Sequence, residues 1–182
     1  MDATTLEMFK RELEKQCRFA LMAYNDLMEI LKQVLKAKKA EDIKRQEVER
    51  IWCSIHAFLM AAGNISKIFW PPKSKYSQRG DELRKSLSVD GDSPLGIRKP
   101  RNYLEHFDEY LQEWIESTKN YRYIDTSFGS LKLIKVLDPD FENGDFLRFF
   151  DYQLRVIVFS KFSFDLKPII KAIDELLTKV RR

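Results

Sequence analysis

The segment from Pro100 to Glu109 contains residue types that could cleave RNA without a metal ion. Proline is favoured in a first helical turn, so this segment is predicted to begin a helix. Asn102 lies one turn before His106, close enough to fix which imidazole nitrogen carries the proton. An imidazole can remove the proton of a ribose 2′-hydroxyl, while the guanidinium of Arg101 can hold the phosphate and offset developing charge. Attack by the 2′-hydroxyl would leave a 2′,3′-cyclic phosphate and would spare DNA.

The placement of Arg101 relative to His106 leaves two arrangements open. The two residues are about 140° apart on an ideal helical wheel. They meet if Arg101 lies in a loosely wound first turn and curls back, or if a second subunit completes the site. Arg50 and His56 have a similar spacing, but Ile51 follows Arg50 where a polar residue is expected. We expect His56 to be a buried histidine satisfied by a hydrogen bond.

The run Arg101-Asn102-x-x-x-His106 resembles the Arg-x(4–6)-His signature of the HEPN superfamily, in which a polar residue, often Asn, commonly follows the arginine. Many members are metal-independent ribonucleases, often toxins or defence effectors, that dimerise so that two motifs line one cleft. Others are inactive binding modules beside nucleotidyltransferases. The resemblance implies that Arg101 and His106 are catalytic and that Asn102 supports them. It also implies a homodimer, with a cognate antitoxin or a nucleotidyltransferase as a further partner.

Two functions follow from these residues. The first is a HEPN-type endoribonuclease that needs neither a metal nor another cofactor and takes RNA as its substrate. The alternative is a catalytically silent module of the same fold that binds RNA, nucleotide or a partner protein.

The segment between Pro71 and Arg101 is the basic part of the chain. It contains eight Lys or Arg and four Asp or Glu, so its net charge of +4 equals that of the whole chain. Cations there could neutralise phosphates, and an aromatic ring could stack on a base; a solvated loop is the alternative. The predicted RNA-binding residues are Tyr76, Arg79, Arg84, Lys85, Arg98 and Lys99.

Composition excludes several classes of protein. With 182 residues, of which 44% are hydrophobic, the chain can bury a core without disulfides or metals. Cys17 and Cys53 stand alone in apolar patterns, which excludes a disulfide framework and makes both expected core residues. No run approaches the ~20 apolar residues of a membrane span, and the start of the chain lacks a signal-peptide pattern. We therefore expect a cytoplasmic protein without membrane contact.

Apolar residues recur at steps of three and four along most of the chain, the period of an amphipathic helix. Thr4 and Glu7 match a capping box at the start of the first such segment. A further helix is predicted after Asp165, which is expected to cap it. The other predicted helices are Thr4–Ala37, Asp42–Trp70, Gln78–Ser88 and Pro100–Ser117.

The segment from Tyr121 to Phe164 has a different pattern, rich in aromatic and β-branched residues. It predicts two to four short antiparallel strands, Leu154–Ser160 among them, with turns at Phe128-Gly129 and Asn143-Gly144. The predicted fold is a single, mainly α domain over 1–182. It is a HEPN-like antiparallel helical bundle (4–118 and 165–182) with a small antiparallel β element at about 121–164, before the C-terminal helix.

Overall fold

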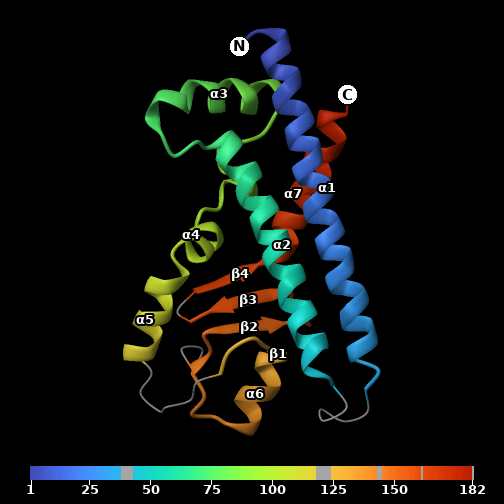
Figure 1. Cartoon of the computed structure of the whole chain (residues 1–182), viewed down its shortest axis with the longest axis vertical. Helices are drawn as coiled ribbons and strands as arrows, with labels where there is room; N and C mark the ends of the chain where they lie inside the picture. Colours follow the sequence, from blue (N-terminus) through green and yellow to red (C-terminus); the bar gives the residue numbers. More distant parts are fainter. Residues whose placement is uncertain (38–42, 118–123, 143–144, 161, 182) are drawn as a thin grey trace. The chain divides into compact units, whose positions relative to one another are not determined.

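A computed structural model describes residues 1–37, 43–117, 124–142, 145–160 and 162–181, with Arg101 described for its backbone alone. The chain is mainly helical, and a four-stranded sheet precedes the last helix, which confirms the predicted mainly α fold with a small β element (Figure 1). The HEPN-like arrangement of the helices stays a prediction. Its contacts divide into two compact units. The first comprises Met1–Met28, Cys53–Arg101 and Pro168–Arg182, and the second comprises Glu29–Trp52 and Asn102–Lys167. The single-domain organisation stays a prediction.

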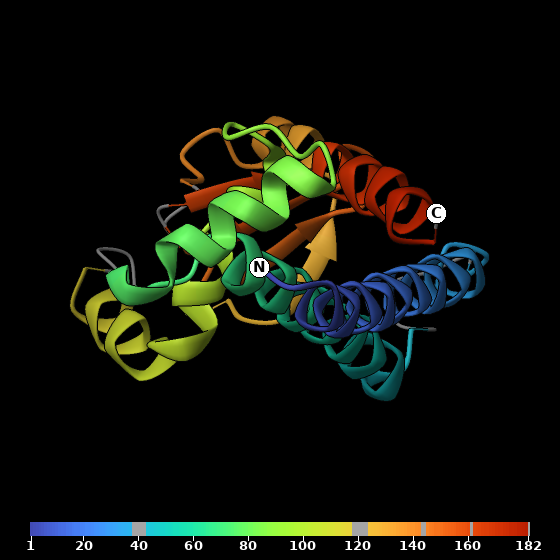
Figure 2. The same cartoon turned by 90° about the horizontal axis from the view of Figure 1, so that it is seen from above.

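Three helices build the core of the first unit: α1 (Ala3–Val34), α2 (Arg45–Phe69) and α7 (Leu166–Val180). Within that unit α1 and α2 lie side by side (Figures 1 and 2). Their apolar stripes meet, and each buried Leu, Ile or Phe contributes about 1.5–3 kcal/mol. The side-chain amide of Asn64 donates to Gln16 Oε1 at 3.2 Å, which fixes the register of the two helices. Fully buried members of this core include Leu13, Cys17, Ile55, Phe58, Ile65 and Ile173.

The start of α1 differs from the predicted capping box. Asp2 Oδ1 accepts a hydrogen bond from the backbone N–H of Thr5 at 2.8 Å, and Oδ2 accepts one from the Thr5 hydroxyl at 2.6 Å. These bonds lower the pKa of Asp2. Glu7 instead pairs with Arg11, one turn further along the helix, at 3.2 Å. The box at Thr4 and Glu7 is therefore wrong, because a carboxylate two residues earlier already caps the helix. The final helix is capped as predicted, since Asp165 accepts from the N–H of Lys167 at 2.9 Å.

The segment after α2 folds closely against the end of that helix. Proline ends α2 after Phe69, and two short helices follow, η2 (Ser74–Tyr76) and α3 (Ser77–Ser86). Gly80 makes this close approach, because a Cβ there would press on the carbonyl oxygen of Phe69 and lie 2.8 Å from Pro71 Cδ. The turn-rich stretch beyond α3 contains a short 3-10 helix, η3 (Pro94–Gly96).

The predicted helix Pro100–Ser117 is divided into α4 (Lys99–Glu105) and α5 (Phe107–Ser117). His106 lies at the division. Its N–H donates to Asn102 O at 2.9 Å, and its carbonyl accepts from the N–H of Tyr110 at 3.2 Å. Both backbone hydrogen bonds of His106 thus join residues four apart, as in a helix, although α4 ends before His106 and α5 begins after it. The prediction of one continuous helix was wrong at this residue.

The sheet of the second unit consists of β1 (Ser127–Gly129), β2 (Arg148–Asp151), β3 (Val156–Phe159) and β4 (Phe162–Asp165), in that spatial order. The last three strands are antiparallel, and β3 confirms the predicted strand within Leu154–Ser160. β1, however, pairs in parallel with β2, so the element is not wholly antiparallel.

A helix that the sequence pattern missed, α6 (Leu131–Leu137), connects β1 to the segment before β2. Such a crossover is what a parallel pair requires. Phe128 and Gly129 are therefore strand residues, and the predicted turn there is wrong. The predicted turn at Asn143-Gly144 lies outside the described residues.

The buried side chains of the sheet divide between its two faces. On one face Phe149 and its cross-strand neighbour Val158 pack with Phe146, and Ile134 of α6 covers them. The other face carries Phe159 of β3. On that second face Phe159 contacts Tyr103, which lies three residues before His106.

Candidate active site

Two aromatic contacts hold α4 and α5 on the sheet. The ring of Tyr103 stacks on Phe159, with ring centroids 3.9 Å apart. One turn later, the guanidinium of Arg148 lies over the ring of Phe107, 4.8 Å from its centroid. Arg148 is itself fixed by Asp125, whose Oδ1 accepts from Arg148 Nε at 2.7 Å. Asp125 thereby raises the pKa of Arg148, so the cation over Phe107 stays charged.

His106 lies between these two anchors in the sequence. Its side chain is 55% exposed, and its Nδ1 lies 3.3 Å from Glu109 Oε1. When Nδ1 carries the proton, it donates to Glu109, and Nε2 becomes the basic nitrogen. The sequence pattern predicts Asn102 in this orienting role, whereas the structure places Glu109 at the imidazole. The signal for it was the i, i+3 spacing, which places the two residues on one helix face.

The other two predicted catalytic residues, Arg101 and Asn102, belong to α4. Asn102 is half-buried, and its carbonyl accepts the His106 N–H. Its predicted effect on the imidazole protonation stays a prediction. The backbone of Arg101 lies in the first turn of α4, but its side chain lies outside the described residues. The convergence of Arg101 and His106 is therefore also a prediction.

The predicted RNA-binding residues all belong to the first unit. Arg79 packs its guanidinium against two aromatic rings, 4.9 Å from the centroid of Phe9 and 5.2 Å from that of Tyr76. Lys75 Nζ lies 4.9 Å from the Tyr76 ring as well. Tyr76 is 41% exposed, but these cations already occupy space around its ring. A base that stacks on Tyr76 would have to share the ring with them.

Arg84 is engaged inside the first unit. It donates to the carbonyl oxygen of Phe69, pairs with Asp81, and lies 5.0 Å from the centroid of the Trp70 ring. A phosphate contact by Arg84 would compete with these bonds. Lys85, Arg98 and Lys99 have exposed side chains. These three are therefore better placed than Arg79 and Arg84 to meet a phosphate.

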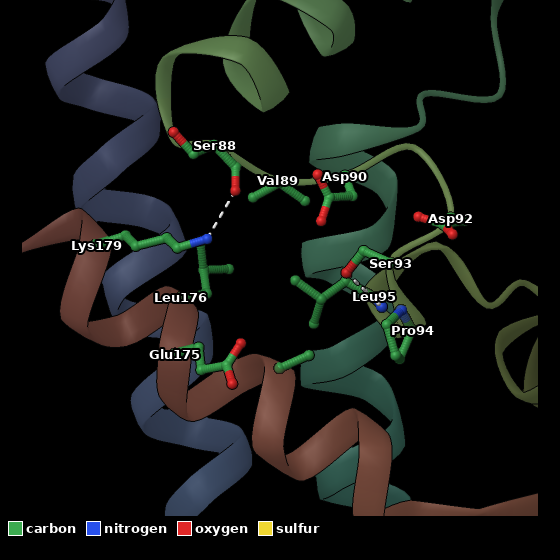
Figure 3. A pocket seen from close by; sticks show the side chains of 11 residues that line it. Ser88, Val89, Asp90, Asp92, Ser93, Pro94, Leu95, Glu175, Leu176 and Lys179 are labelled. Carbon is green, nitrogen blue, oxygen red and sulfur yellow. Dashed lines mark hydrogen bonds between the residues drawn. The ribbon is translucent and has the colours of Figure 1, made fainter.

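The first unit also contains a pocket of about 250 Å³ between α7 and the loop before η3 (Figure 3). Asp90, Asp92 and Glu175 are among its lining residues. Lys179 Nζ donates to the backbone oxygen of Ser88 at 2.7 Å, which ties α7 to the loop. Carboxylates repel phosphate, so this pocket does not suit RNA.

Within the described part of the chain, no group of three or more His, Cys, Asp or Glu side chains could hold a metal ion. The same residues include no helix long and apolar enough to cross a membrane. Cys17 is buried as expected, and burial raises its thiol pKa to about 12. Cys53 is exposed, so the expectation of a core residue was wrong there. Comparison of the chain with protein-family models, curated proteins and solved structures gives no match.

Proposed function

We propose that this chain is a metal-independent endoribonuclease that cleaves RNA by 2′-hydroxyl attack and leaves a 2′,3′-cyclic phosphate. The observation that carries the proposal is the exposed imidazole of His106, oriented through Nδ1 by Glu109 at 3.3 Å. An exposed histidine with one nitrogen engaged by a carboxylate is suited to accept a proton at its other nitrogen. The motif Arg101-Asn102-x-x-x-His106 is the ground for the HEPN-type assignment.

In the proposed reaction, Nε2 of His106 takes the proton of the 2′-hydroxyl as its oxygen attacks phosphorus. The bond between phosphorus and the 5′-oxygen breaks, and the 5′-oxygen leaves with a proton from the imidazolium or from water. The Glu109 carboxylate stabilises the imidazolium that forms. Arg101 binds the scissile phosphate and offsets its increasing negative charge, while Asn102 supports the imidazole. The stack of Tyr103 on Phe159 and the contact of Phe107 with Arg148 fix the backbone on both sides of His106. That rigidity limits the loss of geometry on binding RNA.

A homodimer is the proposed assembly, because it allows a second copy to complete the site. The exposed cations of the first unit, with Arg98 and Lys99 directly before the motif, would contact flanking phosphates. A cognate antitoxin or a nucleotidyltransferase is proposed as a regulatory partner. Cytoplasmic RNA is the proposed substrate.

The test is incubation of the purified chain with a labelled single-stranded RNA in the presence of EDTA. We expect cleavage with cyclic phosphate ends, and no cleavage of DNA of the same sequence. General acid–base catalysis contributes about 10²–10⁴-fold, so His106→Ala should lose at least about 10²-fold in rate. Arg101→Ala should lose a comparable factor. Glu109→Gln keeps an acceptor oxygen and should lose only about tenfold.

His56→Ala is the matched control, because His56 is the only other histidine and is half-buried in α2. Its stability should fall while its cleavage rate per folded molecule stays unchanged. Cleavage that survives both His106→Ala and Arg101→Ala would refute the proposed site. RNA binding without cleavage would assign the silent binding module instead.

A further inference from the structure

The second unit contains a groove of about 710 Å³ that the proposed cleavage does not use. It lies between the end of α1, the start of α2, strand β1 and helix α6, and its lining is mainly apolar. The lining residues that matter most are Val34, Leu35, Val48, Phe128 and Leu133. Pockets of this size bind drug-sized ligands or peptide side chains.

Large apolar side chains at this groove are exposed to solvent. Leu35 is 50% exposed and Leu133 is 57% exposed. Val136 and Leu137 lie three and four residues after Leu133, on the same face of α6, and are 68% and 76% exposed. An apolar surface that extends from a groove onto a neighbouring helix is typical of a protein docking site.

The groove also reaches the backbone of β1. Thr126, Ser127 and Phe128 are consecutive, and all three line it. Thr126 precedes β1, and Ser127 and Phe128 belong to it. Because successive side chains of a strand point to opposite faces, the presence of both Ser127 and Phe128 in the lining indicates that the groove runs along the edge of the strand. β1 is an edge strand of the sheet. Edge strands pair readily with an extended segment of another chain.

The acidic residues next to the lining are engaged within the fold. Asp125 binds Arg148. Asp151 is buried and accepts from the backbone N–H of Leu131 at 2.9 Å. Glu47 accepts from a backbone N–H at the start of α2 at 2.8 Å. Their charges are therefore compensated by donors of the protein itself.

Three exposed lysines also lie close to lining residues in the sequence. Lys36 follows Leu35, Lys44 precedes the start of α2, and Lys132 precedes Leu133; all three side chains are exposed. Mainly apolar residues thus line the groove, and three exposed lysines adjoin lining residues or the helix start in the sequence. A ligand that matches it must present apolar side chains with negative charges between or beside them.

We propose that this groove binds an extended acidic peptide segment of a partner protein. The segment pairs with the edge of β1 and places large aliphatic side chains against Leu35, Phe128 and Leu133. Its carboxylates face Lys36, Lys44 and Lys132. RNA satisfies the three lysines but leaves the apolar lining without a matching surface, so a peptide is the better occupant.

The test uses a fluorescent peptide of roughly eight residues, the length of a long strand, in which Leu and Asp alternate. Binding to the full chain is measured by fluorescence anisotropy. One control peptide replaces every Asp with Lys, and a second replaces every Leu with Ser. We expect only the Leu-Asp peptide to bind, and more weakly at high salt.

Leu133→Ser and Leu154→Ser form a matched pair of variants. Both leucines are in the second unit, with exposed fractions of 57% and 51%, but only Leu133 lines the groove. We expect Leu133→Ser to weaken binding by about tenfold, which is the loss of roughly one buried aliphatic contact. Leu154→Ser should change binding less than about twofold. Far-UV circular dichroism checks that both variants remain folded.

Three results would overturn the proposal. The first is equal binding of the Leu-Asp and Leu-Lys peptides, or no binding of either up to millimolar concentration. The second is displacement of the peptide by oligouridine, which would assign the groove to RNA. The third is self-association of the chain that Leu133→Ser abolishes, which would assign it to a second copy. Each of these readouts is independent of RNA cleavage.

Discussion

Replacing Gly80 with alanine has two opposing effects on the free energy of unfolding. Gly80 lies within helix α3, where alanine is normally favoured over glycine by about 1 kcal/mol. The added Cβ would press on the carbonyl oxygen of Phe69, a backbone atom, and would lie 2.8 Å from Pro71 Cδ. Overpacking of this kind costs about 1–3 kcal/mol, and a backbone atom yields less easily than a side chain.

The displaced carbonyl has a second role that increases the cost. Phe69 O accepts a hydrogen bond from Arg84 Nη1, and bonds to charged donors contribute about 1.5–3 kcal/mol. If α3 shifts away from α2, part of that energy is lost. The sum of these effects exceeds the helix-propensity gain. We expect Gly80→Ala to lower the free energy of unfolding by about 2 kcal/mol.

The assay is urea denaturation followed by circular dichroism, with the midpoint and slope compared between variants. Gly91→Ala is the matched control, because a Cβ at Gly91 meets no atom within 4 Å. That variant should be unchanged or more stable by about 0.4–1 kcal/mol. A Gly80→Ala protein at least as stable as the wild type would refute the close approach of α3 to the end of α2.

Four further predictions concern individual side chains. The Tyr103 hydroxyl is buried without a hydrogen-bond partner among the described residues, so Tyr103→Phe should raise the free energy of unfolding by about 1 kcal/mol; a loss measured in urea would contradict this. Exposed Cys53 should react rapidly with a thiol reagent at pH 8, whereas Cys17 should react only on unfolding, and two fast thiols would disprove the assigned burial. Burial raises the pKa of the Cys17 thiol to about 12, so the thiol of the unfolded chain ionises at lower pH than that of the folded protein. The free energy of unfolding should therefore decline as pH rises from about 9 toward 12. Cys17→Ala should remove this part of the pH dependence. Asp151 accepts from three backbone N–H groups, and Asp151→Asn should cost about 2–3 kcal/mol in the same urea assay, where an unchanged midpoint would count against that role.

The helices were predictable because their apolar residues recur with a strong period. Features set by contacts distant in sequence were not. β1 is only three residues long, and it is a strand because it pairs with β2, about twenty residues further along. Locally, Phe128-Gly129 has the composition of a turn, so no local signal could have corrected that prediction. The cap at Asp2 was missed because Thr4 and Glu7 match a capping box equally well by sequence.

In the candidate site, too, features set by local spacing were predictable, and contacts between residues far apart in the sequence were not. Residue type and spacing identified His106 as the candidate base, and the structure shows that its side chain is 55% exposed. The pair of Glu109 with His106 follows from the same spacing. The contact of Arg148 with Phe107 and its bond to Asp125 join residues far apart in the chain. Sequence periodicity carries no information about such contacts.

The two units differ in how far apart in the sequence their segments lie, and this difference affects folding during synthesis on the ribosome. The four strands and α6 are contiguous in the chain, so this sheet can assemble from neighbouring residues as they emerge. The first unit instead joins residues that are far apart in the sequence, as the ion pair of Glu14 with Arg181 shows. The apolar stripe of helices α1 and α2 therefore stays exposed until α7 is translated. A nascent chain arrested before α7 should be the species most in need of a chaperone.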